Sequence, residues 1–269
     1  MENTRFDTAS TPLTVVLVHG AFADSSGWAG VIERLGATGV NVIAAVNPLR
    51  SVAHDSAYLA SVFSQIPGPV LAVGHSYGGV VITNAAAQAD NVVGLVYVAG
   101  FLPDDGESLL DIEGNSRDSV LASSLTAREY PLGSGEKAVE LSIDPAKFHE
   151  AFGEDLPVRQ TAVMAVTQRP ASALAFSEPT GAPAWRTLPS WAVIPTGDYA
   201  AGTDVLSFMA RRAGATVTEV AGSHAIMVSQ PQVVTDVIQS AIAATTSYRH
   251  PAGHPYEAGF RPRSETDPS

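Results

Sequence analysis

The chain has 269 residues, of which 45% are hydrophobic and 16% are charged, enough apolar surface to bury the core of one large domain. Lys and Arg number 15 against 27 Asp and Glu, so the formal net charge is −12 and the surface would repel a phosphate backbone. Nucleic acid is therefore not an expected partner. The chain has no cysteine, which excludes disulfides, thiolate metal sites and a Cys nucleophile.

The start of the chain and its longest apolar runs bear on its location in the cell. Residues 1–12 are predicted to form a polar N-terminal extension, which lacks the apolar core of a secretory signal. No apolar run reaches the roughly 18–20 residues that span a bilayer. We therefore expect a cytoplasmic protein without a membrane partner. Its oligomeric state is left open.

Short apolar runs alternate with helical spacings over the first hundred residues. Runs typical of buried parallel strands lie at 13–18, 41–46, 69–74 and 92–101. Hydrophobic residues at helical intervals lie between them, at 28–39, 55–66 and 80–89. This order predicts an α/β protein with a parallel sheet that helices cover on both faces.

The alternation stops at residue 103 and resumes at residue 190. Residues 103–189 are rich in Pro, Gly and Ser, with short helical patches at 145–152 and 158–168. Two more strands follow at 190–198 and 216–222, with helices at 204–214 and 231–245. We expect one domain over 13–246, with 103–189 inserted as a cap after the fourth strand. Because only about a dozen residues precede the first strand, the sheet is predicted to have six strands, all parallel.

The last segment, 247–269, has no hydrophobic periodicity and is predicted to be a C-terminal tail. It holds His250 and His254 at a spacing that would put two metal ligands on one face of a helix. Pro251 and Pro255 disrupt a helix there, so no metal site is expected.

The sequence GHSYGG at 74–79 places Ser76 between a predicted strand and a predicted helix. In the pattern G-x-S-x-G, a sharp turn at this place exposes the serine hydroxyl at the start of the helix. The positive end of the helix dipole then favours developing negative charge. Ser76 is therefore the candidate nucleophile.

A serine nucleophile needs a base and a group that orients the base. In the chain order Ser, acid, His, the acid follows a late strand and the histidine precedes the last helix. Asp198 and His224 occupy these places. Asp104 and Asp105, which follow the strand that ends at Phe101, are alternatives for the acid.

Two backbone N–H groups are needed to stabilise an oxyanion. One is expected from Tyr77, directly after the nucleophile. The other is expected from the loop after the first strand, where Gly20 permits a close approach: Ala21 N–H, with Phe22 N–H as the alternative. His19 is predicted to bond this loop rather than to act in catalysis.

The pocket for the substrate is expected to be apolar. Phe22, Trp28, Tyr77 and residues of the insertion are predicted to form its walls, and His75 is predicted to line it or to pack behind it.

Four segments resemble the α/β-hydrolase superfamily: HGAFADSSGW (19–28), GHSYGG (74–79), TGD (196–198) and GSHAIMVSQPQ (222–232). The chain is most similar to the small cap-bearing branch of plant-type methylesterases and hydroxynitrile lyases and to its uncharacterised bacterial relatives. The resemblance covers about 13–245. It implies that Ser76, Asp198 and His224 form a catalytic triad and that 103–189 is a cap over the site.

Two positions distinguish reactions within that branch. Hydroxynitrile lyases of this type have a threonine and a lysine where this chain has Gly20 and Ala225. The missing lysine argues against lyase chemistry. We expect a cofactor-independent serine hydrolase, a carboxylesterase acting on small or medium apolar esters or lactones. The alternatives are a non-catalytic ligand-binding protein of this fold, or the same triad used for perhydrolysis, acyl transfer or carbon–carbon cleavage.

Overall fold

The structure is a computed structural model that describes residues 11–133 and 135–246. The N-terminal extension up to residue 10 lies outside the described residues. So does the predicted tail at 247–269, with its His250–His254 pair.

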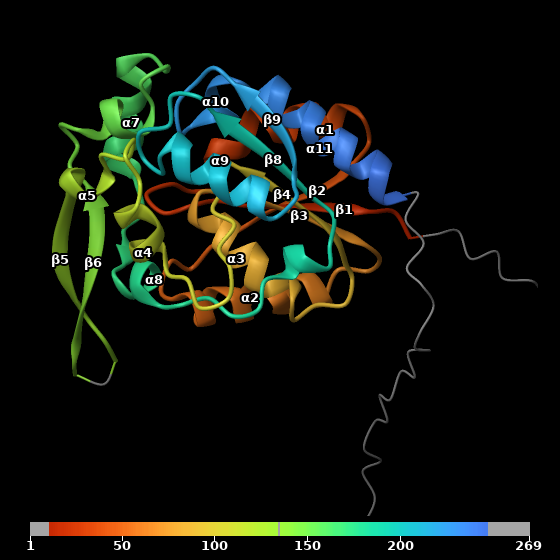
Figure 1. Ribbon diagram of the computed structural model, residues 1–269, viewed down its shortest axis with the longest axis horizontal. Helices are drawn as coiled ribbons and strands as arrows, with labels where there is room; N and C mark the ends of the chain where they lie inside the picture. The colour runs from red at the N-terminus through yellow and green to blue at the C-terminus, as the bar shows by residue number, and fades with distance from the viewer. Residues whose placement is uncertain (1–10, 134, 247–269) are drawn as a thin grey trace, which may run out of the picture.

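Six parallel strands form the central sheet, in the order β2-β1-β3-β4-β8-β9 (Figure 1). The strands are β1 (Thr14–Val18), β2 (Asn41–Ala45), β3 (Val70–His75), β4 (Val92–Val98), β8 (Ser190–Pro195) and β9 (Thr216–Val220). The prediction of six strands, all parallel, is confirmed. The central strands β1, β3 and β8 are buried along their whole length, whereas the edge strands β2 and β9 are partly exposed.

Helices cover both faces of this sheet (Figure 1). Helices α2 and α3 pack together on one face, and α1 packs with α11 on the other. The helices outside the insertion are α1 (Ala29–Ala37), which follows the 3₁₀ turn η1 (Ser25–Trp28), α2 (Val52–Ser64), α3 (Tyr77–Ala86), α9 (Thr203–Arg212), α10 (Ile226–Ser229) and α11 (Pro231–Thr246). All five helices predicted in these parts of the chain are present, within a few residues of the expected bounds.

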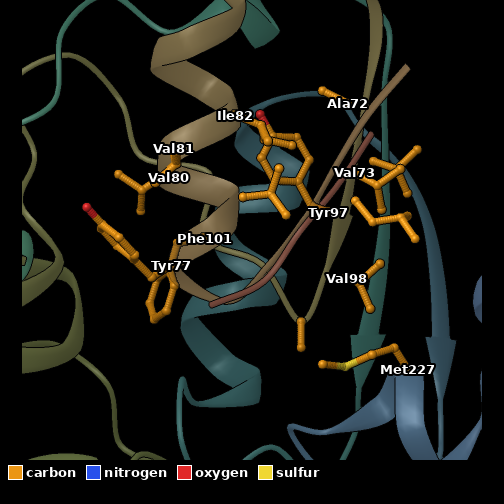
Figure 2. Close-up of a cluster of buried hydrophobic side chains, with 14 of the residues drawn as sticks. Ala72, Val73, Tyr77, Val80, Val81, Ile82, Tyr97, Val98, Phe101 and Met227 are labelled. Carbon is orange, nitrogen blue, oxygen red and sulfur yellow. The ribbon is translucent and has the colours of Figure 1, made fainter. Parts of the chain in front are cut away.

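Helix α3 is the most buried helix element, and each of its ten residues is buried. Figure 2 shows Ile82 on α3 close to Tyr97 of β4. The one polar group of that ring is satisfied, because its hydroxyl lies 2.8 Å from Thr83 Oγ1. The helix that begins at the candidate nucleophile is therefore fixed against the sheet along its length.

Residues 103–189 lie between β4 and β8 and are called the insertion from here on. The insertion holds α4 (Leu109–Gly114), α5 (Leu121–Ser124), β5 (Leu125–Pro131), β6 (Lys137–Ile143), α6 (Phe148–Phe152), α7 (Val158–Thr167), β7 (Ala171–Ser172), α8 (Leu174–Ser177) and the 3₁₀ turn η2 (Ala184–Arg186). The two predicted helical patches are α6 and α7. The antiparallel sheet β5-β6-β7 was not predicted, and its strands β5 and β6 project from one end of the molecule (Figure 1).

The described residues contain neither a candidate membrane span nor a candidate metal cluster. None of their helices is long and apolar enough to cross a membrane. In the same part of the chain, no three His, Asp or Glu side chains are grouped so that they could hold a metal ion.

Candidate active site

Ser76 lies at the sharp turn between β3 and α3. Its backbone has φ 54° and ψ −125°, a conformation that costs a residue with a side chain about 1–3 kcal/mol. Two hydrogen bonds hold the turn, because the Ser76 carbonyl accepts from the N–H of Gly79 at 2.9 Å and of Phe101 at 3.2 Å. Ser76 therefore has the sharp-turn backbone conformation that the sequence pattern predicted.

The two outer glycines of the pattern are required by close backbone contacts. A Cβ atom at Gly74 would lie 2.5 Å from the Gly78 carbonyl oxygen. A Cβ atom at Gly78 would lie 2.5 Å from the Val18 carbonyl oxygen at the end of β1. Both distances are far below a normal carbon–oxygen contact, so any larger residue would move the backbone that carries Ser76.

Asp198 and His224 lie on the loops after β8 and β9, and both are buried. His224 Nδ1 is 2.7 Å from Asp198 Oδ2. The other carboxylate oxygen accepts from the N–H groups of Ala200 at 3.0 Å and Ala201 at 2.8 Å. Because an ionised carboxylate can only accept, the geometry assigns the proton to His224 Nδ1 and leaves Nε2 as the free acceptor.

The two alternative acids lie elsewhere. The Asp104 carboxylate pairs with the Arg186 guanidinium, and Asp105 is exposed. The structure brings neither of them to His224.

The imidazole of His224 packs against two other rings, which are themselves 6.0 Å apart. Its centroid is 4.7 Å from the ring of His75 and 4.9 Å from the ring of Phe152. His75 Nε2 is 3.0 Å from the carbonyl oxygen of His224, so this nitrogen donates its proton. Burial, and then the neighbouring His224, lower the pKa of His75 well below its usual value, which keeps it neutral.

This packing corrects the predicted place of Trp28 and decides between the two places predicted for His75, which packs behind the pocket wall. His75 and Trp28 are both fully buried, with their rings edge to face at 6.4 Å, and neither lines the cavity that holds Ser76. They pack against each other and, through His75, against the ring of His224. His75 therefore supports the histidine loop instead of facing a ligand.

The loop after β1 passes directly against the serine turn. A Cβ atom at Gly20 would lie 2.6 Å from Ser76 Cβ and 2.8 Å from the His75 carbonyl oxygen. Ala21 and Phe22 follow, and Phe22 has a left-handed φ of 60°. This close approach puts the backbone of both residues beside the nucleophile candidate.

His19 holds that loop in place, as predicted. Its Nε2 accepts from Asn47 N–H at 3.1 Å and lies 3.2 Å from Arg169 Nη1, while its Nδ1 is 2.9 Å from the Gly20 carbonyl oxygen. Because Nε2 faces only donors, the ring is neutral with its proton on Nδ1. Burial lowers the pKa of His19 to about 4.

Tyr77 contributes one face of its ring to the site. The ring stacks on Phe176 with centroids 6.4 Å apart. Figure 2 shows its hydroxyl directed away from Tyr97 and the sheet, and it donates to Asp55 Oδ2 at 2.8 Å. Burial, followed by the charge of Asp55, raises the pKa of Tyr77 well above its usual value, so the hydroxyl stays protonated.

A narrow cavity with about 280 Å³ of empty space brings together five of the predicted residues, Ala21, Phe22, Ser76, Tyr77 and His224. The loops that follow the strands supply Ala21, Phe22, Ser76, Tyr77, Phe101, Ala200, Ala201 and His224, and the insertion supplies Leu109, Glu113, Leu121, Phe152 and Phe176. In the part of the chain that the structure describes, no hydrogen bond joins Ser76 Oγ to His224. The five insertion residues were missed because no motif or spacing marks them.

A parallel sheet with a strained serine turn and an acid–histidine pair on two later loops defines the class of α/β hydrolases. The sequence model of the alpha/beta hydrolase family matches residues 15–237. The chain belongs to this family. No curated protein sequence matches this chain.

Solved structures with this fold are similar over most of the chain. Polyneuridine aldehyde esterase has a TM-score of 0.72 and 20% identity, covering 86% of this chain and 99% of its own. A pyrethroid hydrolase from Sphingobium faniae has a TM-score of 0.69 and 20% identity, covering 88% and 100%. Tomato methylketone synthase I, solved with 2-tridecanone, has a TM-score of 0.72 and 18% identity, covering 87% and 99%. At these identities the likeness establishes the fold.

Proposed function

We propose that this protein is a serine hydrolase that cleaves carboxylic esters through an acyl-enzyme. The observation that carries the proposal is the buried Asp198–His224 hydrogen bond of 2.7 Å, whose histidine lines the same cavity as the strained Ser76. A nucleophile, a base and a group that orients the base are the three parts that acyl transfer requires.

In the acylation step, Ser76 Oγ attacks the acyl carbon of the ester. Its proton passes to His224 Nε2, while Asp198 holds the imidazole tautomer and stabilises the imidazolium. The negative charge on the former carbonyl oxygen is stabilised by the N–H groups of Tyr77 and Ala21, with Phe22 N–H as the alternative. Each such donor contributes on the order of 3 kcal/mol.

The intermediate then collapses and the ester C–O bond breaks. His224 returns its proton to the leaving alkoxide, which departs as the alcohol. In deacylation, a water molecule gives a proton to His224, attacks the acyl carbon and releases the acid, and the proton returns to Ser76.

The walls of the cavity support small or medium apolar esters or lactones as substrates. Phe22, Leu109, Leu121, Phe152 and Phe176 surround the nucleophile candidate, and the space between them is narrow. Two of the similar solved structures are named an esterase and a pyrethroid hydrolase, which agrees with this class.

The test is turnover of p-nitrophenyl acetate and butyrate by the wild type, Ser76→Ala and His224→Ala. We expect each substitution to lower kcat by several powers of ten, because the nucleophile or its base is lost. Ser64→Ala, at an exposed serine on α2, is the matched control and should retain its rate.

Two results would contradict the mechanism. One is a Ser76→Ala variant that keeps most of the wild-type rate. The other is an inactive wild type, and tight binding of an ester by such a protein would favour a ligand-binding function instead.

A further inference from the structure

The cavity contains an acidic side chain that the proposed mechanism does not use. Glu113, in α4 of the insertion, lines the same cavity as Ser76 and His224. The other insertion residues that line it are Leu109, Leu121, Phe152 and Phe176, all apolar. Across the described residues, the Glu113 carboxyl has no hydrogen bond or ion pair. A polar group without a partner in an apolar cavity is available to a ligand.

The segment after α4 is tied to the loop that carries Asp198. Ser116 Oγ donates to Asp204 Oδ1 at 2.7 Å, and Arg117 N–H donates to Asp204 Oδ2 at 2.9 Å. Val120 N–H donates to the Tyr199 carbonyl oxygen at 2.8 Å. Glu113 is therefore held in a defined position relative to the proposed triad.

The charges around Glu113 are negative or neutral. Asp198 is the acid whose charge acts on the Glu113 carboxyl, and Glu178, directly after α8, accepts from Ala53 N–H at 2.9 Å. Asp111, on the same helix, is exposed, and the side chain of Arg117 is 86% exposed and pairs with Asp204. Among the residues that the structure describes, no cation forms an ion pair with the carboxyl.

The protonation of the carboxyl follows from this environment. Glu113 is partly exposed as a residue, and it lines the cavity among the four apolar side chains of the insertion. Burial, followed by the charge of Asp198, raises the pKa of Glu113 to about 8. At neutral pH the group is a carboxylic acid, which can donate a hydrogen bond.

We propose that Glu113 determines substrate specificity by donating a hydrogen bond from its carboxylic acid to an uncharged oxygen of the substrate, outside the ester group that is cleaved. The preferred substrates are then esters with a second oxygen, such as an ether, ketone or hydroxyl. The inference rests on the proposed esterase function. A purely alkyl ester would bury the acid without a partner, which is why the site discriminates against it.

Esters that differ only by an oxygen in place of a methylene test this role. One pair varies the alcohol part, 2-methoxyethyl acetate against butyl acetate. The other varies the acyl part, ethyl 3-methoxypropanoate against ethyl pentanoate. The ratio of kcat/KM within each pair is measured for the wild type, Glu113→Gln and Glu113→Leu, so that differences in intrinsic reactivity cancel between variants.

We expect the preference for the ether in at least one pair to fall about tenfold in Glu113→Leu. Glu113→Gln should keep most of the preference because its amide N–H can donate. Glu150→Gln, at an exposed glutamate of the insertion, is the matched control and should behave as the wild type. Ratios in Glu113→Leu equal to those of the wild type in both pairs would overturn the proposal.

The pH dependence gives a second readout that does not need the leucine variant. As the pH rises through about 8, Glu113 loses its proton, so the wild-type preference should decline while that of Glu113→Gln stays constant. A wild-type preference that is flat between about pH 6 and about pH 9 would refute the role of Glu113.

Failure of this inference is distinct from failure of the proposed function. If the wild type cleaves both alkyl esters and Ser76→Ala does not, the esterase function stands whatever the ether ratios are. If the wild type cleaves none of the four esters, the function itself is wrong.

Discussion

Asp198 is bonded through both carboxylate oxygens, one to His224 and one to two backbone N–H groups. In Asp198→Asn, the side-chain amide can satisfy these partners only if the imidazole changes its tautomer. We expect kcat for p-nitrophenyl butyrate to fall by about 10⁴. Asp104→Asn should change it by less than about threefold. A larger loss in Asp104→Asn than in Asp198→Asn would make Asp104 the acid.

Protonation of His19 is predicted to make the stability of the folded chain depend on pH. Its pKa is lowered to about 4 in the folded chain, so between about pH 4 and about 6.5 the unfolded chain binds the extra proton. Stability therefore decreases as the pH falls through this window, and His19 accounts for at most about 3 kcal/mol of the loss.

The contribution of His19 to this loss can be measured by denaturant unfolding. The wild type and His19→Gln are compared at about pH 7 and at about pH 4. The variant should be less stable at about pH 7, because its bonds to Gly20 and Asn47 are lost, but it should lose less free energy of unfolding on acidification. An equal loss in both proteins would show that protonation of His19 does not drive the change.

Individual residues could be predicted from the sequence where a backbone position dictates them. Ser76 stands in a turn that only a particular glycine pattern allows, and Asp198 and His224 directly follow strands that end at the same edge of the sheet. Trp28 was placed wrongly and the place of His75 was left open, because whether an aromatic ring faces a cavity or lies behind its wall depends on tertiary packing. Glu113 could not be found, since its environment is created by the fold and no motif marks it.

At the scale of elements, α9 is joined to the start of the insertion. Arg212 Nη1 and Nη2 donate to the two carboxylate oxygens of Glu107 at 2.5 and 2.8 Å, and Nη2 also donates to the Leu102 carbonyl oxygen at 3.1 Å. The hydrogen bonds from Arg212 hold the pKa of Glu107 below its usual value. This stabilisation is present above the usual range of a carboxyl group and is lost as the pH falls through it.

Arg212→Gln removes this bidentate contact. Because both side chains are partly exposed, we expect a loss of only about 1–2 kcal/mol in the free energy of unfolding at neutral pH. Arg211→Gln, at the exposed neighbouring position, should be near wild type. Urea unfolding measures both, and equal stability of the two variants would show that the contact contributes nothing.

The strands differ in how well they could be predicted from the sequence. The buried strands are short apolar runs, because both faces of the sheet are covered. Strand β5 is exposed over most of its length, so its residues show neither an apolar run nor a clear alternation. Its partner β6 has only one fully buried residue, at its end, so it shows no apolar run either, and the β5–β6 pair is defined by backbone hydrogen bonds more than by burial.

For the whole molecule, the order of elements was enough to predict the sheet. The sequence has four apolar runs, then a break of nearly ninety residues, then two further runs. This order predicts one sheet with a single long insertion, and this arrangement is observed. The internal structure of the insertion did not follow from the sequence, since most of its elements are short and show little regular apolar spacing. In the function that we propose, substrate preference depends on that part of the chain.

The net charge of −12 acts on the whole molecule and predicts a dependence on salt. An anionic ester should meet a repulsive potential as it approaches, and this potential is screened as the Debye length shortens from about 30 Å at 0.01 M to about 8 Å at 0.15 M ionic strength. We expect kcat/KM for 4-sulfophenyl butyrate to rise with added salt, by no more than about tenfold, and that for phenyl butyrate to stay constant. Comparing the two esters in one salt series separates charge repulsion from general salt effects on the enzyme. An equal response of both esters would mean that local contacts in the cavity, and not the charge of the molecule, control the approach of substrate.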